Sequence, residues 1–193
     1  MTAVLRDLYG IFKIRIGIAI ALSAVAGLAV TPGISLPAWQ VAVLGFAALG
    51  ASAAAGAFNQ LIERDLDARM ARTRKRPFVT GRYRGGAVWY LGVLLLLTGS
   101  VTVAGVLFNP LVAVYLFLGA FTYGVVYTVW LKKRTPWNIV IGGLSGTFAV
   151  LAGSAAVSPV PGPVPAILAM VLFLWTPPHF WSLAAALKRD YEQ

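Results

Sequence analysis

Long uncharged stretches alternate with short charged ones along this chain. Residues 16–62, 85–131 and 135–187 contain no Asp, Glu, Lys or Arg. Each stretch is far longer than the roughly 20 apolar residues that one membrane-spanning helix needs. Each also has a Gly- or Pro-containing turn signal near its middle: TPGISLP (31–37), FNP (108–110) and SPVPGPVP (158–165). The pattern therefore predicts a series of helical hairpins that cross a membrane.

We expect about six spanning helices of roughly 20 residues, near residues 14–30, 38–60, 87–107, 111–131, 138–157 and 166–187. Strands are not expected, because the apolar runs are continuous and an open sheet edge cannot lie in lipid. A signal peptide is a weaker interpretation of the N-terminus, because the apolar run after Arg15 is longer than a signal-peptide core. The predicted fold class is all-α, a polytopic membrane helical bundle.

Composition agrees with this fold class. The chain is 59% hydrophobic and 11% charged, whereas a soluble domain carries about a quarter charged residues. Its net charge of +10 would suggest nucleic acid in a soluble protein. In a membrane protein that charge fits loops against anionic lipid or a site for an anionic substrate, so no nucleic-acid partner is expected. Cysteine is absent, which excludes disulfides and thiolate metal sites.

The charged residues are confined to the N-terminus, the 63–84 connection, KKR (132–134) and the C-terminal KRDYEQ. With six helices these places lie on one side of the membrane, and Lys and Arg accumulate on the cytoplasmic side. Both termini are therefore predicted to be cytoplasmic. Small residues crowd GFAALGASAAAGAFN (45–59), which predicts close helix packing, with room for a ligand as the alternative.

The candidate chemistry is concentrated in NQLIERDLDARMARTRKRP, from Asn59 to Pro77. Asn59, Glu63 and Asp67 are four residues apart and would share one helix face. Carboxylate and amide oxygens suit Mg²⁺, which fills its shell with water and phosphate oxygens. The run Arg72, Arg74, Lys75 and Arg76 follows, and guanidinium groups bind phosphate well. Together they suggest a diphosphate with a lipid tail. The competing interpretation is a solvated loop that obeys the positive-inside rule.

These residues carry a family resemblance. Asn59-x3-Glu63-x3-Asp67, followed by RTRKRP (72–77) and TG (80–81), resembles the first Asp-rich motif of the UbiA-type intramembrane prenyltransferases. KKRTPWNIVIGG (132–143) and LWTPPHFWSLA (174–184) are similar to the protoheme IX farnesyltransferases, or heme O synthases. The resemblance extends from about Lys13 to Tyr191 and implies a single UbiA-type domain over 1–193. Glu63 stands where the family more often has Asp, which keeps the charge.

The resemblance implies transfer of a farnesyl group from farnesyl diphosphate to a vinyl group of heme B (protoheme IX), giving heme O, with Mg²⁺. It implies that Asn59, Glu63 and Asp67 hold Mg²⁺–diphosphate and that Arg72 and Arg76 hold phosphate oxygens. The other candidate substrate contacts are Lys13, Asp65, Lys132, Asn138 and His179. A bacterial inner-membrane location, a site facing the cytoplasm and a heme A synthase or oxidase-assembly partner are further expectations.

Several of these assignments have alternatives. Asp65 joins the stripe only if the helix unwinds there. Lys132 begins a basic run that either anchors the topology or holds diphosphate or heme propionates. Pro177 and Pro178 should kink the last helix and free backbone groups. His179, the only histidine, then either contacts heme or bonds a freed carbonyl. The nearby aromatic residues line a cavity or simply pack: Trp175, Phe180 and Trp181.

Two other functions remain open. One is prenyl transfer to a quinone or chlorin acceptor, against which TPPHFW argues. The other is a non-catalytic membrane remnant or a small transporter, which should place ionisable groups near the membrane midplane. The resemblance implies about nine helices of near-spanning length and a second acidic motif, and the segment that reaches Asp190 resembles the beginning of that motif. We therefore expect a domain shortened at its C-terminus and, alone, an inactive fragment.

Overall fold

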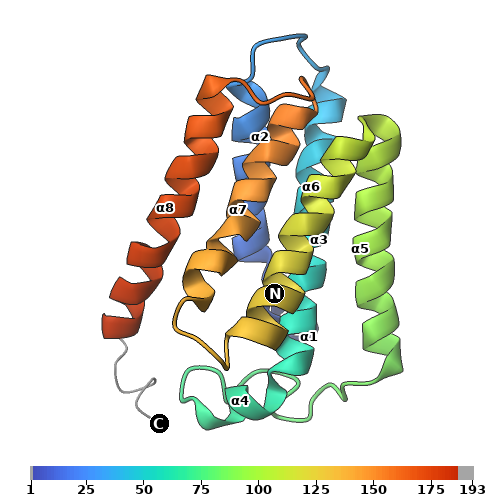
Figure 1. Cartoon of the computed structure of the whole chain (residues 1–193). Coiled ribbons are helices and arrows are strands. Elements are labelled where there is room, and N and C mark those ends of the chain that lie inside the picture. The colour runs from blue at the N-terminus through green and yellow to red at the C-terminus, as the bar shows by residue number, and fades with distance from the viewer. Residues whose placement is uncertain (1, 187–193) are drawn as a thin grey trace.

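The computed structural model describes residues 2–186 as a bundle of helices (Figure 1). In chain order the elements are α1 (Ala3–Ile11), α2 (Ile14–Ala29), α3 (Ala38–Ile62), α4 (Arg64–Arg69), α5 (Ala87–Leu107), α6 (Pro110–Phe121), the π-helix η1 (Thr122–Leu131), α7 (Asn138–Ala155) and α8 (Pro163–Ala186). The described part of the chain contains no strand, so the predicted all-α class is confirmed. Asp190 and the C-terminal KRDYEQ lie outside the described residues.

Five helices are long and apolar enough to cross a membrane: α3, α5, α6 continued by η1, α7 and α8. The predicted first span, 14–30, matches α2, but α2 has only 16 residues. It qualifies only together with α1, from which it is bent by 51°. The prediction of six spans therefore holds if the bent pair counts as one, and α1 itself was not predicted.

The two ends of the bundle differ in charge. The turns predicted at 31–37, 108–110 and 158–165 lie at one end, and α4 and the turn after η1 lie at the other (Figure 1). Of the described residues, Lys and Arg from α4 to the start of α5 and from 132–134 all belong to this second end. The predicted placement of these two charged connections at one end is confirmed for the described residues, and the charged C-terminal KRDYEQ lies outside them.

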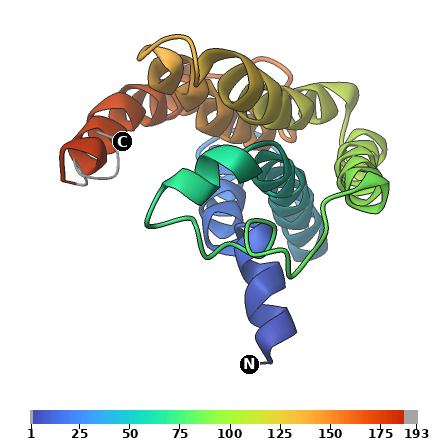
Figure 2. The same ribbon diagram turned by 90° about the horizontal axis from the view of Figure 1, so that it is seen from below.

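Small side chains make α3 the central helix. Seen from below, α8, α7, η1 with α6, and α5 form a curved row, and α2 and α3 lie along its inner side (Figure 2). The residues that α3 buries are mostly alanines: Ala47, Ala48, Ala51, Ala53, Ala54, Ala55 and Ala57. Lipid gives helices little hydrophobic reason to associate, so close van der Waals contact between small residues has to hold them together. The predicted close packing of 45–59 is confirmed.

The closest approach joins α2 and α7 through two glycines. A Cβ placed on Gly27 would overlap the carbonyl of Val150, and one on Gly153 would overlap the carbonyl of Ala24. The two backbones are thus in direct contact, which only glycine permits at these positions. The contact lies in the second half of α2 and fixes the position of that half against α7.

The predicted fourth span, 111–131, is not one regular α-helix. Its last ten residues form η1, a π-helix, and such wide turns occur frequently at functional sites. The prolines Pro177 and Pro178 lie inside α8, which continues through both of them without a break in the helix. The irregular backbone therefore lies beside the charged end of α3, and not in the TPPHFW segment.

The charged connection after α3 is held against the bundle by a buried aromatic side chain. Phe78 is 3% exposed and packs edge-on against Trp89, with ring centroids 5.0 Å apart. Arg82 donates a 2.6 Å hydrogen bond to the buried Asp7 of α1, and this bond raises the pKa of the Arg82 guanidinium. These contacts give the loop a defined path, which positions the charged residues it carries.

Candidate active site

The stripe of Asn59, Glu63 and Asp67 keeps its shared face across the junction of α3 and α4. Glu63 ends α3, yet its N–H bonds Asn59 O at 2.9 Å and Asp67 N–H bonds Glu63 O at 2.8 Å. The three side chains are 1%, 4% and 3% exposed. The four-residue spacing thus survives the break, and two carboxylates are buried at the end of an apolar helix.

Each buried carboxylate is matched by a cation from another segment. Arg76 Nη1 lies 2.5 Å from Asp67 Oδ2, and Lys132 Nζ lies 2.6 Å from Glu63 Oε1. Burying a carboxylate is costly unless a countercharge or hydrogen bonds compensate it. These pairs therefore draw the 70–77 loop and the end of η1 towards the stripe.

The pair at Glu63 is less complete than the pair at Asp67. Lys132 is close enough for strong charge attraction, which does not depend on direction. Its alignment does not make a hydrogen bond, so the buried Glu63 Oε1 has no hydrogen-bond partner among the described residues. A buried oxygen in this state favours a better-placed partner, such as a cation entering with a ligand.

Lys13 supplies a third cation, at the break between α1 and α2. Its Nζ donates hydrogen bonds to Asn59 Oδ1 at 2.5 Å and to the Tyr123 hydroxyl at 2.7 Å. Asn59 Nδ2 donates to Thr128 Oγ1 at 3.1 Å, and Thr128 Oγ1 donates in turn to Tyr123 O at 2.8 Å. The amide of Asn59 is thereby held with its oxygen towards Lys13 and its nitrogen towards η1.

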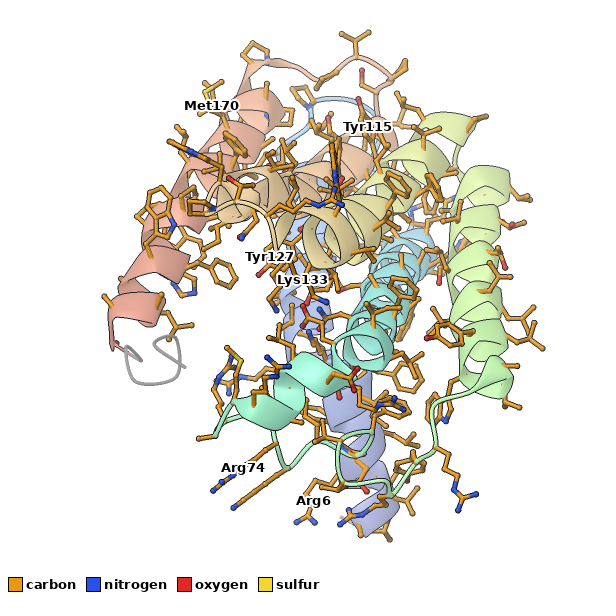
Figure 3. All side chains as sticks on the ribbon, turned by 60° about the horizontal axis from the view of Figure 1, so that its bottom comes forward. Arg6, Arg74, Tyr115, Tyr127, Lys133 and Met170 are labelled. Carbon is orange, nitrogen blue, oxygen red and sulfur yellow. The ribbon has the colours of Figure 1, made fainter. Side chains whose placement is uncertain are left out.

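Two stacked tyrosines of η1 lie beside these residues. The rings of Tyr123 and Tyr127 are 5.7 Å apart with 12° between their planes, and Lys132 Nζ lies 5.8 Å from the centre of the Tyr127 ring. Figure 3 shows Tyr127 on the side of η1 towards the charged connection, whereas Arg6 and Arg74 lie at the outer edge of that end. Ammonium groups over such ring faces are attracted by the ring quadrupole.

Six of the residues predicted from the sequence come together here: Lys13, Asn59, Glu63, Asp67, Arg76 and Lys132. The role of Lys132 as a topology anchor alone does not explain its ion pair with a buried acid. Sequence reasoning missed four polar neighbours: Gln60, Tyr123, Tyr127 and Thr128. The available signal was the set of polar side chains within the apolar spans, where such groups default to a functional hypothesis.

Three predicted contacts lie elsewhere in the described structure. The Asp65 side chain is 92% exposed and faces Arg64 at 3.7 Å, because the helix does not unwind to bring it inward. Arg72 is exposed and has no ion pair or hydrogen bond within the described residues. Asn138 Nδ2 donates to Thr135 O at 2.7 Å, a local contact at the start of α7.

His179 is exposed on α8. Its ring stacks on Trp175, with centroids 4.2 Å apart and 15° between planes, and meets Phe180 edge-on at 5.4 Å. The alternative, a bond from the imidazole to a freed carbonyl, is not observed in the described part of the chain, where the one side-chain hydrogen bond at this residue runs from Ser182 Oγ to His179 O. Among the described residues, no hydrogen bond, ion pair or ring contact joins His179 to the Asn59 stripe.

The described residues contain no cluster of three or more His, Cys, Asp or Glu side chains that would hold a metal by themselves. Two buried carboxylates and one amide oxygen line the stripe. This number of protein ligands suits an ion such as Mg²⁺, which binds through one or two carboxylates and completes its shell with water and phosphate oxygens.

The chain is similar to known proteins. Residues 20–193 match the UbiA prenyltransferase family. The chain belongs to this family. With its apolar helices, it is an integral membrane protein. No solved structure matches it.

Three similar relatives have names that specify an activity. The chain is 56% identical to "Protoheme IX farnesyltransferase 2" of Paramagnetospirillum magneticum, an alignment that covers 99% of this chain and 66% of that protein. It is 46% identical to "Protoheme IX farnesyltransferase 1" of the same organism, over 97% of this chain and 66% of the relative. It is 42% identical to "Protoheme IX farnesyltransferase" of Parvibaculum lavamentivorans, over 97% of this chain and 58% of that protein. The chain thus spans somewhat less than two thirds of the length of these curated relatives.

Proposed function

We propose that this chain takes part in transferring the farnesyl group of farnesyl diphosphate to a vinyl group of heme B, forming heme O. The observation that carries the proposal is the pairing of two buried carboxylates with cations from separate segments, at the charged end of an apolar bundle. Such a site suits a charged head group on an apolar chain. The printed names of the relatives support the same reaction.

The stripe would hold Mg²⁺ through Glu63 and Asp67, with Asn59 as a neutral oxygen ligand. The unsatisfied Glu63 Oε1 supports this fit. When bound, Mg²⁺ neutralises part of the negative charge of the diphosphate. Arg76 and Lys132, which face the two acids in this structure, then bind phosphate oxygens while the acids hold the metal. The site exchanges one set of ion pairs for another, and no charge is left buried alone.

These charges serve the bond-breaking step. The bond between farnesyl C1 and the diphosphate oxygen breaks, and its electron pair leaves with the diphosphate. The vinyl carbon of heme attacks the allylic cation, and water then adds to the product cation with loss of a proton. Cationic groups placed where negative charge develops lower the barrier. The apolar bundle keeps water from the allylic cation until the carbon–carbon bond has formed.

The test is product formation by the full chain in lipid nanodiscs, supplied with farnesyl diphosphate, heme B and Mg²⁺. Heme O detected by mass spectrometry would support the proposal and would show that the expected inactivity of the chain alone is wrong, and none should form when EDTA replaces Mg²⁺. A quinone precursor and a chlorin, offered in place of heme B, test the alternative acceptors. Prenylation of either one in preference to heme B would contradict the proposal, and transfer to no acceptor would agree with the expected inactive fragment or with a non-catalytic membrane protein.

His179 is proposed as a heme contact, because an exposed imidazole between two aromatic rings on α8 is free to meet a porphyrin. In the same nanodiscs, His179→Ala should weaken heme binding by about tenfold, the loss of one good contact, and leave farnesyl diphosphate binding unchanged. Met170→Ala is the matched control, because Met170 is an exposed side chain nearer the start of the same helix (Figure 3). An unchanged heme spectrum and affinity would restrict His179 to a structural role.

We propose that the charged end faces the cytoplasm of a bacterial inner membrane, since Lys and Arg accumulate on that side. A reporter active only outside the cytoplasm should be silent after Gln193 and active when inserted in the turn at 158–162. The reverse pattern would overturn the orientation.

A membrane protein that consumes heme O, of the heme A synthase or oxidase-assembly kind, is the proposed partner, and co-purification would test it.

A further inference from the structure

Lys13 has a backbone conformation that a residue with a Cβ rarely adopts. With φ at 48° and ψ at 43° it lies in the left-handed region, and it is the only residue other than glycine with a positive φ in the described chain. A side chain with a Cβ adopts this conformation at a cost, so surrounding structure has to impose it. The contacts that impose it come from a single turn of α3.

Gln60 holds the end of α1 that precedes the break. Its Nε2 donates to Gly10 O at 2.7 Å and to Ile11 O at 3.4 Å. The last carbonyls of a helix lack intrahelical partners. Lys13 N–H reaches Gly10 O at 3.2 Å, and Gln60, 3% exposed, adds a side-chain donor to this carbonyl and to that of the buried Ile11. Gln60 thus ties the end of α1 to α3.

Gly56 leaves the space in which the Lys13 side chain lies. A Cβ at Gly56 would lie 3.2–3.3 Å from Cβ, Cγ and Cδ of Lys13, which is closer than ordinary packing allows. The stem of Lys13 therefore runs directly over Gly56. One turn farther along α3, its ammonium reaches Asn59 Oδ1.

The ammonium that this arrangement delivers differs from the other cations of the site. Arg76 and Lys132 each face a buried carboxylate, whereas Lys13 forms no ion pair within the described residues. It bonds only the neutral oxygens of Asn59 and Tyr123. An ammonium has three donors, so one remains for an incoming anion.

We propose that Gly56 and Gln60 are positioning residues for Lys13: they hold the α1–α2 break so that its ammonium meets the diphosphate. This inference rests on the proposed function, because it takes the diphosphate as the ligand. One turn of α3 then has two roles. Asn59 contacts the ligand, and Gly56 and Gln60 set the position of the Lys13 ammonium.

The experiment compares Gly56→Ala and Gln60→Leu with Gly45→Ala, all on α3, in the full chain in nanodiscs. At Gly45 a Cβ would make only an ordinary 3.8 Å contact with Val25. We expect the first two variants to raise the KM for farnesyl diphosphate, and the Kd of inorganic diphosphate with Mg²⁺, by about tenfold through misplacement of a few tenths of an ångström. The kcat should stay within about twofold, and Gly45→Ala should match the parent protein.

The same substitutions in a Lys13→Ala background separate positioning from general damage. If Gly56 and Gln60 act through Lys13, their effects on diphosphate binding vanish once Lys13 is absent. Equal effects in both backgrounds, or unchanged binding in the Lys13-containing variants, would overturn the inference. If one of the two variants does not insert into the membrane, the test rests on the diphosphate binding of the other. A parent protein that does not bind Mg²⁺–diphosphate refutes the proposed function itself, which is a separate result.

Discussion

Asp67→Asn is expected to lower the rate of farnesyl transfer by about 10³-fold or more, the scale on which pre-placed electrostatic groups act in active sites. The substitution keeps the size of the side chain and an oxygen that accepts from Arg76, but it removes the charge. A metal held by the stripe would lose one of its two carboxylates. Arg76 would keep a hydrogen-bond acceptor but lose the acid that balances its charge. The measurement is the initial rate of heme O formation at saturating Mg²⁺ and farnesyl diphosphate.

Asp65→Asn is the matched control, because Asp65 lies on the same short helix α4 and its side chain is 92% exposed. Its rate should stay within about twofold of the parent, as expected for a surface pair that contributes little. Equal losses in both variants would mean that the net charge of the connection matters and that the buried stripe does not. A normal rate in Asp67→Asn would remove the stripe from the mechanism.

The structure also changes how this experiment has to be designed. Asparagine is a better replacement than alanine because of the contacts that Asp67 makes. Asp67 is 3% exposed and paired with Arg76, so Asp67→Ala would leave a guanidinium without its partner. The Arg76 side chain is 23% exposed and can turn towards water, but asparagine avoids the question because it still accepts a hydrogen bond.

The sequence predicts the spans and the acidic stripe well because both depend on local patterns. Helix α5 occupies the predicted residues 87–107, since its ends are set by a charged connection and a turn. The stripe needs only the four-residue spacing from Asn59 to Asp67, and that spacing survives the irregular backbone at Glu63. Periodicity and charge are read directly from the chain, so these features required no knowledge of which helices are neighbours.

The choice between Arg72 and Arg76 shows where sequence reasoning ends. Both belong to one basic run, and spacing gives no reason to separate them. The fold separates the two arginines. Thr73 Oγ1 donates to Asp67 O at 2.8 Å, and Arg76 N–H bonds Thr73 O at 2.9 Å. The loop therefore turns back and aims Arg76 at Asp67, while Arg72 is left exposed. This selection depends on a buried threonine that no motif marks.

The η1 helix and the break at Lys13 were not predictable for a related reason. The chain on either side of Lys13 is compatible with a continuous helix. The side chain that holds the end of α1 at the break is Gln60, 47 positions after Lys13 and on another element. Likewise the network from Lys13 through Asn59 to Thr128 joins three elements. Such contacts are tertiary, and a single sequence without a fold contains no direct sign of them.

Gly153→Val is expected to give the largest loss of stability in this protein. A Cβ on Gly153 would overlap the carbonyl of Ala24, so α2 and α7 must separate to admit even a methyl group. Overpacking a core against side chains costs about 1–3 kcal/mol. Here the obstacle is backbone, which cannot change rotamer, and the two further methyl groups of valine extend the overlap. We therefore expect at least the upper part of that range, or failure to insert.

Gly92→Val tests the same substitution where there is room, since a Cβ at Gly92 of α5 meets no atom within 4 Å. Its unfolding temperature in nanodiscs should stay close to that of the parent protein. Gly153→Ala gives a milder form of the first change in case the valine variant does not insert. Because α2 begins one residue after Lys13, moving α2 away from α7 should also displace that ammonium from Asn59. Gly153→Ala is thus expected to lower both the unfolding temperature and the affinity for Mg²⁺–diphosphate. If Gly153→Ala and Gly92→Val unfold at the same temperature, the direct backbone contact between α2 and α7 does not limit the stability of the bundle.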